Sequence, residues 1–149
     1  MIKIKFIKTA SFNILKKEDL EGAISIALFA SNFSEVKFEY KALAPNWKIQ
    51  DKFKKKILSE KKFIIAYQEQ LDELNPAIVA EHLNLLTAGE EPILMCHCSK
   101  TEFCHRHLTA DWLQNKLGVY IEEFGSSEYI RKDGYLIKKE EPSLFEKKN

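Results

Sequence analysis

Three short apolar runs, separated by segments of helical length, most constrain what this chain can fold into. The runs span residues 23–29, 92–96 and 119–124. A strand of a parallel sheet is covered on both faces, so it reads as a continuous apolar run of this length. Strands that alternate with helices form a mainly parallel sheet with helices on both faces. The sequence therefore predicts one α/β domain with Rossmann-like layering.

The segments between the runs carry helical spacing and helix-boundary residues. Residues 49–74 are rich in lysine and are expected to be mostly helical. Asn75 and Pro76 are expected to open another helix, because Asn caps helix N-termini and Pro suits the first turn. A further helix over residues 103–117 should stop at Gly118.

The two ends of the chain and one internal loop are expected to differ from this pattern. Residues 2–8 alternate apolar and lysine side chains, which predicts a strand with one solvated face near a sheet edge. The domain is predicted to span residues 1–137, and residues 138–149 are predicted to form a charged tail. Residues 31–47 show no clear periodicity, and a loop of that length is either functional or poorly ordered.

Composition restricts the class of protein and its partners. A chain of 149 residues can bury one core without disulfides. The net charge of +1 gives no global basic field, so a nucleic-acid partner has no support from charge. No apolar run approaches the roughly 20 residues that span a bilayer, and no signal peptide is expected. Three cysteines within nine residues make a poor disulfide framework and suit a reducing, cytoplasmic compartment.

Cysteine and histidine are concentrated directly after the run that ends at Cys96. The segment from there to His107 holds all three cysteines and three of the four histidines. It also contains Arg106, one of only two arginines beside 21 lysines, which indicates a need for the planar five-donor fork of arginine. Ligands of parallel sheets bind outside the carboxyl ends of the strands, so topology and chemistry predict the same site.

The first interpretation of this segment is an anion or substrate site whose chemistry is done by Cys104, His105 and Arg106. Cys104 falls near the start of a predicted helix, where the unpaired N–H groups and the macrodipole favour negative charge. The adjacent basic side chains should lower the pKa of its thiol. Arg106 is expected to hold a phosphate or carboxylate through two parallel hydrogen bonds.

The second interpretation is a zinc site formed by Cys96, Cys98, Cys104 and a histidine such as His105. Three cysteines and one histidine are a known composition of structural zinc sites. The Cys-x-Cys spacing is tighter than usual, and all the donors come from one segment, both of which count against a metal. No cofactor is therefore expected, with zinc as the alternative.

The third interpretation is that the cysteines are packing residues. Cysteine is among the most buried residue types and often behaves as a small apolar side chain. Cys104, Leu108 and Trp112 follow one another at four-residue spacing, so they form one stripe of the predicted helix. On this interpretation the histidines are merely exposed.

Tyr40, Lys41 and Trp47 lie in the irregular loop and provide a weaker signal. A lysine flanked by aromatic side chains can hold a phosphate while a ring stacks on a base. A surface loop with its aromatic side chains tucked against the core is the alternative, and the segment alone favours it.

Several of these segments together resemble the family catalogued as domain of unknown function 488. An apolar strand ends in Cys96, seven residues follow, and Cys104-His105-Arg106 then opens a helix. Residues 40–47 resemble the Tyr-Lys-x-Leu-Ala-Pro-x-Trp segment of the family, and residues 7–12 resemble its opening. The family has no established reaction. The resemblance implies that the site residues are Cys96, Cys104, His105, Arg106, Tyr40, Lys41, Trp47 and Ser11.

Two departures from the family pattern bear on the function. Cys98 and His97 do not belong to the pattern, which weakens the zinc interpretation. Relatives often carry a basic residue after the second strand, whereas residues 26–29 contain none, so a ligand contact made there is expected to be missing.

These observations predict a binder or enzyme that acts on a small anionic ligand, either a nucleotide or a phosphorylated metabolite. The alternative is a non-catalytic zinc-binding or nucleic-acid-associated module. Loops at the end of a sheet converge, so Tyr40 or Lys41 is also expected beside the turn that carries Cys104 and Arg106. The sequence leaves the oligomeric state open.

Overall fold

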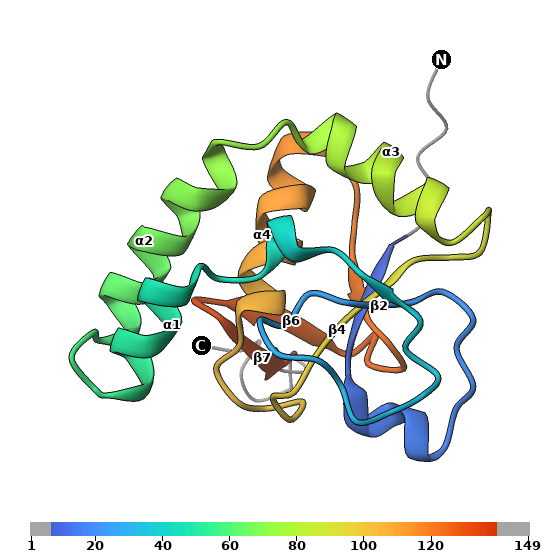
Figure 1. Cartoon of the computed structure of the whole chain (residues 1–149), viewed down its shortest axis with the longest axis horizontal. Helices are drawn as coiled ribbons and strands as arrows, with labels where there is room; N and C mark the ends of the chain where they lie inside the picture. Colours follow the sequence, from blue (N-terminus) through green and yellow to red (C-terminus); the bar gives the residue numbers. More distant parts are fainter. Residues whose placement is uncertain (1–6, 140–149) are drawn as a thin grey trace, which may run out of the picture.

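A computed structural model describes residues 7–139, which form a five-stranded parallel sheet, four α-helices and a C-terminal hairpin (Figure 1). The strands of the sheet are β1 (Lys8–Ser11), β2 (Ala23–Ser25), β3 (Phe38–Glu39), β4 (Ile93–Cys96) and β5 (Glu122–Glu123). The helices are α1 (Trp47–Lys54), α2 (Glu60–Asp72), α3 (Pro76–Leu86) and α4 (His105–Leu117), with short 3-10 helices η1 (Phe12–Lys16) and η2 (Lys41–Leu43). The prediction of an α/β domain with a mainly parallel sheet is confirmed.

β4 is the middle strand of the sheet, whose order is β3-β2-β4-β1-β5. It pairs in parallel with β2 on one side and with β1 on the other, where Ser11 lies opposite Cys96. The chain inserts β4 between two strands that precede it in the sequence, so the connections diverge at its carboxyl end. Ligands of open α/β sheets bind at such a switch point, and Cys96 is the last residue of this strand.

Helical segments cover both faces of the sheet, but unequally. The face that carries Ile24 and Leu94 forms one hydrophobic cluster with buried residues of all four α-helices. The opposite face, which carries Ile93 and Met95, packs against η1 and the loops beside it. The start of α4 reaches from the first cluster to the second, because Cys104 belongs to the second.

The predicted helix boundaries are confirmed where a capping residue marks them. The side chain of Asn75 accepts hydrogen bonds from the first turn of α3, and Pro76 is the first residue of that helix. Gly118 ends α4 with a φ of 68°, a left-handed conformation that glycine adopts without steric cost.

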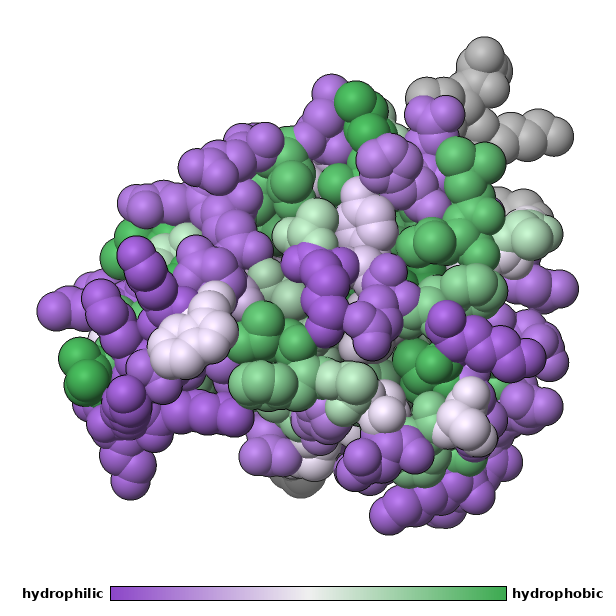
Figure 2. Space-filling view, viewed as in Figure 1, coloured by the Kyte–Doolittle hydropathy of each residue, from purple (hydrophilic) through white to green (hydrophobic). Residues whose placement is uncertain are grey.

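Hydrophilic side chains dominate the surface around α1 and α2 in Figure 2, as expected from their lysine content. Among residues 7–139, no helix is long and apolar enough to cross a membrane.

The strands are shorter than predicted. Most of the predicted strand over residues 2–8 falls outside the described residues. The described strand β1 begins at Lys8 and lies next to the edge strand β5, between β5 and β4. Its residues Thr9, Ala10 and Ser11 are all buried, because the sheet covers them on both sides.

Two elements were not predicted. The irregular loop contains β3, whose two residues are too few to show a period. Near the C-terminus, β6 (Tyr129–Lys132) and β7 (Tyr135–Lys138) form an antiparallel hairpin. Only Leu136 of the hairpin is fully buried among its strand residues, so the hairpin shows no apolar pattern. The predicted charged tail begins at the last residue of β7, and its residues from 140 onward lie outside the described part of the chain.

Candidate functional site

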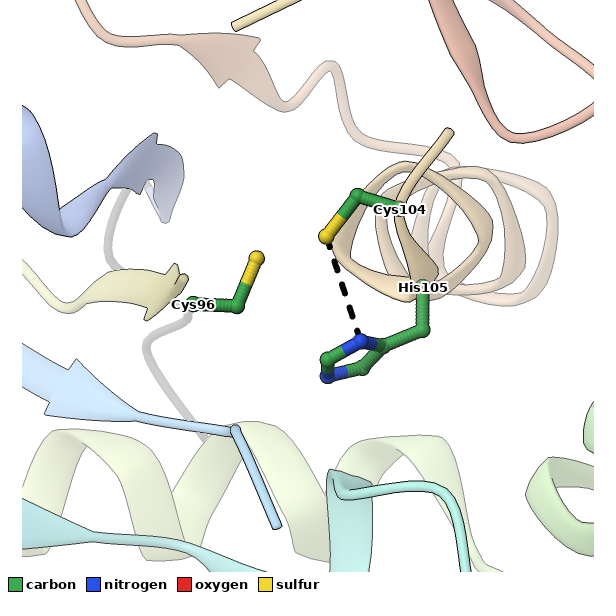
Figure 3. A group of neighbouring side chains, drawn as sticks. All are labelled: Cys96, Cys104 and His105. Atoms are coloured by element: carbon green, nitrogen blue, oxygen red, sulfur yellow. Dashed lines mark hydrogen bonds between the residues drawn. The ribbon is translucent and has the colours of Figure 1, made fainter. Parts of the chain in front are cut away.

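The end of β4 and the start of α4 bring two cysteines and a histidine together. Cys96 ends the strand, Cys104 is the N-cap of the helix and His105 is its first residue. One sulfur or nitrogen atom from each of the three lies within 4.8 Å of the others, and all three residues are buried. Figure 3 shows their side chains pointing toward one another from the strand and the helix.

A backbone carbonyl fixes the tautomer of His105. Its Nε2 lies 2.6 Å from the carbonyl oxygen of Ile26. A carbonyl can only accept, so Nε2 carries the hydrogen and Nδ1 presents a lone pair. Burial lowers the pKa of His105, which keeps the ring neutral. Nδ1 lies 3.9 Å from the Sγ of Cys104 (dashed line in Figure 3), in position to accept a proton at that sulfur.

The three cysteines differ in their preference for charge. Burial raises the pKa of Cys104, but hydrogen bonds from Cys96 and Cys98 and the charge of Arg106 outweigh it, so this pKa lies well below its usual value. Burial raises the pKa of Cys96, and hydrogen bonding to Cys104 and Cys96 raises that of Cys98. The group therefore favours one thiolate, on Cys104, beside two neutral thiols.

The Arg106 side chain is fully buried and uses all five of its N–H groups within the protein. Two donate to the Glu123 carboxylate, from Nε at 3.1 Å and from Nη2 at 2.9 Å. Nη1 donates to the Sγ of Cys96 at 3.1 Å and to the carbonyl of Cys98 at 3.0 Å. Nη2 also donates to the carbonyl of Ser99 at 3.1 Å. In this arrangement Arg106 contributes charge and position, and its fork is engaged by Glu123.

Glu123 and Arg131 complete this buried network, and neither was predicted as a site residue. The hydroxyl of Thr9 donates to Glu123 at 2.7 Å and accepts from Nη2 of Arg131 at 2.7 Å. Nη1 of Arg131 lies 3.9 Å from Glu123 and also bonds His107 on α4. The scarcity of arginine in this chain was the signal that could have identified Arg131 beside Arg106.

A cavity of about 360 Å³ opens beside the cysteines. Phenylalanine rings form much of its wall, and the rings of Phe53 and Phe63 each lie 5.4 Å from that of Phe103. The ammonium of Lys54 lies 5.0 Å from the centre of the Phe29 ring. The residues that line the cavity include Phe29, Phe53, Lys54, Phe63, Cys96, Cys98, Phe103, Cys104 and His105. An apolar wall with a few polar groups is typical of small-molecule sites.

The predicted residues Tyr40 and Lys41 lie one layer behind this cavity. Tyr40 bonds the Nδ1 of His82 on α3 at 2.7 Å, away from the thiols. Lys41 donates to the carbonyls of Ala27 and Leu28, at 3.2 and 2.7 Å, and both of those residues line the cavity. Lys41 therefore holds the wall of the cavity in place through the backbone after β2.

The predicted site residues Ser11 and Trp47 do not line the cavity and belong to the starts of η1 and α1. The hydroxyl of Ser11 accepts from the backbone N–H of Asn13 and caps η1, although Ser11 lies beside Cys96 in the sheet. Trp47 is the first residue of α1, is 62% exposed and does not line the cavity.

Cys96, Cys104 and His105 are also the residues that could hold a metal ion. Two thiolates and an imidazole, with one position open, form a donor set that zinc enzymes use. A histidine ligand usually donates its second N–H to a carbonyl or carboxylate, as His105 does to Ile26. Cys98, which was included in the predicted zinc set, lies outside this group of three.

Comparison with known proteins identifies the family. The family model described as the active DUF488-N3 subclade matches residues 15–117. No curated protein and no solved structure matches the chain. The match spans more than two-thirds of the 149 residues and includes Cys96 and the Cys104-His105-Arg106 turn. The chain therefore belongs to the DUF488 family, within the subclade described as active DUF488-N3.

Proposed function

We propose that this protein is an enzyme whose Cys104 thiolate attacks a small anionic ligand bound in the cavity. The sulfur forms a covalent bond to the ligand as a leaving group departs, and water then cleaves that bond and regenerates the thiolate. The observation that carries the proposal is that Cys104 lines the cavity and has a pKa well below its usual value. A thiolate is the nucleophilic form of cysteine, and enzymes activate it by nearby positive charge and by a helix N-terminus.

The neighbouring side chains have complementary roles in such a reaction. His105 presents the lone pair of Nδ1 toward Cys104, so it can accept a proton from the water that cleaves the covalent intermediate. Arg106 stabilises the thiolate by charge and positions Cys96 through the bond from Nη1. The raised pKa values of Cys96 and Cys98 keep the charge on Cys104.

The wall of the cavity favours a ligand with a planar ring and a negative group. Aromatic side chains stack on flat rings, and the rings of Phe53 and Phe103 line this cavity. An anionic group beside Cys104 would be repelled by the thiolate, so it is expected near Lys54 instead. Residues 26–29, which follow the second strand, contain no basic residue, but Lys54 places a positive charge beside Phe29 of that segment. A nucleotide has both features.

Limiting iodoacetamide, followed by trypsin and mass spectrometry, tests the nucleophile. Trypsin separates residues 101–106, which carry Cys104, from the peptide that ends at Lys100 and carries Cys96 and Cys98. Fragment ions then distinguish the last two. We expect Cys104 to react faster than Cys96. Equal rates at Cys96 and Cys104 would remove the basis of the proposal.

Protection of Cys104 by adenosine monophosphate tests the ligand class. We expect protection in the parent protein and weaker protection in Lys54→Met. Lys52→Met is the matched control, because Lys52 lies on the same helix, is exposed and does not line the cavity. If adenosine monophosphate and other nucleoside monophosphates leave the rate at Cys104 unchanged, a nucleotide is not the ligand.

A non-catalytic zinc-binding module is the second candidate, favoured by the close approach of Cys96, Cys104 and His105. Metal analysis after gel filtration separates the two proposals. Stoichiometric zinc that is lost in His105→Ala, together with alkylation of Cys104 only after chelation, would favour the zinc module. Metal-free protein with a reactive Cys104 would favour the enzyme.

A further inference from the structure

The hairpin of β6 and β7 packs against α4 (Figure 1). Its turn contains Asp133 and Gly134, both with positive φ, of 50° and 85°. The carbonyl oxygen of Gly134 accepts a hydrogen bond of 2.9 Å from the backbone N–H of Cys104. The turn therefore fixes the backbone of the cysteine itself, although 30 residues separate the two in the sequence.

The same turn lies against the ring that precedes Cys104. A Cβ at position 134 would lie 2.4 Å from Cε1 of Phe103, so only glycine fits there without displacing the ring. The ring packs against three aromatic side chains, since Phe53 and Phe63 lie 5.4 Å from it and Tyr135 of β7 lies 5.5 Å from it. Gly134 and Tyr135 thus hold Phe103 from the hairpin side.

Arg131 of β6 attaches the hairpin to the rest of the domain at a second point. Its side chain is 4% exposed and donates to the carbonyl of Ile121 at 2.9 Å and to the hydroxyl of Thr9 at 2.7 Å. It also bonds His107, in the first turn of α4. The hairpin therefore contacts the start of α4 through both its turn and its first strand.

We infer that the β6–β7 hairpin is a positioning element for the Cys104 thiolate and that Gly134 is its main positioning residue. The inference rests on the proposed role of Cys104 as nucleophile. The hairpin lies beyond residues 15–117, so the family match assigns it no role. The side chain of Cys104 makes no capping hydrogen bond to the first turn of α4, and the bond that its backbone N–H donates to the carbonyl of Gly134 constrains its geometry instead.

Gly134→Ala tests the inference against a matched control. Gly125 also has a positive φ, of 69°, but a Cβ there meets nothing within 4 Å, so Gly125→Ala carries the backbone strain without the contact. We expect Gly134→Ala to lower the ratio of Cys104 to Cys96 alkylation several-fold. Gly125→Ala should leave this ratio unchanged, even if both variants melt at lower temperature.

Shortening the opposing side chain should reverse the effect. In Gly134→Ala with Phe103→Leu, the added methyl group has room, so the alkylation ratio should return to that of Phe103→Leu alone. A loss of stability without a positional role would not show this reciprocal rescue. Tyr135→Leu, at a half-buried position, removes one ring that packs against Phe103 and should lower the alkylation ratio to a smaller extent. This variant tests the inference if Gly134→Ala does not fold.

The outcomes separate this inference from the proposed function. If Cys104 shows no preference over Cys96 in the parent protein, the proposed nucleophile fails. If the parent shows the preference and neither Gly134→Ala nor Tyr135→Leu alters it, the positioning role of the hairpin is overturned while the nucleophile stands.

Discussion

Acid should destabilise this protein through the buried side chain of His107. Burial and the charges of Arg106 and Arg131 lower its pKa to about 2. Its Nδ1 faces the guanidinium of Arg131, and its Nε2 has no partner among the described residues. The unfolded chain binds a proton at this histidine below about pH 6.5, whereas the folded chain does not. The stabilisation is therefore complete above about pH 6.5 and is lost as the pH falls toward 2.

The size of the effect follows from the shift. Each pH unit below the unfolded pKa costs about 1.4 kcal/mol for one such group, so lowering the pH from ~7 to ~5 should cost about 2 kcal/mol through His107. Burial also lowers the pKa of His105, which adds a loss of the same sign. A comparison of variants at the two pH values isolates the share of His107.

Urea unfolding of the parent and of His107→Asn provides that comparison. Asn keeps an acceptor for Arg131 but does not titrate. The loss of unfolding free energy between the two pH values should be about 2 kcal/mol smaller in His107→Asn than in the parent. The same pH dependence in His107→Asn as in the parent would refute the reasoning.

Three further substitutions test the buried network and the wall of the cavity. Arg106→Met should lower the free energy of unfolding by about 3–5 kcal/mol, because Glu123 stays buried without its main partner. A loss below about 1 kcal/mol would contradict this. Thr9→Val should cost about 1–3 kcal/mol by urea unfolding, since Glu123 and Arg131 each lose a hydrogen bond, and an unchanged midpoint would contradict it. Lys41→Met should speed hydrogen exchange over residues 26–29 with little change in global stability, and unchanged exchange there would show that Lys41 does not hold this segment.

The sequence predicted the parts of the fold that local patterns specify. The run at residues 92–96 and the helix that ends at Gly118 were visible because a continuous apolar stretch and a glycine cap each have a local cause. One rule, that ligands bind outside the carboxyl ends of parallel strands, predicted a site at Cys96, and the structure brings Cys104 to the same place.

The remaining features depend on contacts between distant parts of the chain. Arg106 was predicted to bind a ligand. The local sequence could not reveal that its guanidinium instead pairs with the carboxylate of Glu123 on another strand. The hairpin was missed because Arg131 and the carbonyl of Gly134, neither of them apolar, attach it to the domain. A pattern of apolar residues does not reveal polar contacts of this kind.

The pH dependence of alkylation at Cys104 tests the central claim most directly. The rate with iodoacetamide is measured at each cysteine of the chelator-treated parent protein by peptide mass spectrometry. We predict that the rate at Cys104 falls much less per pH unit between about pH 9 and pH 7 than the rate at Cys96, because its pKa lies well below the usual value. The rate at Cys96 should fall about tenfold per unit over the same range, because its pKa is raised. An equal fall at the two cysteines would show that the pKa of Cys104 is not lowered and would contradict the account.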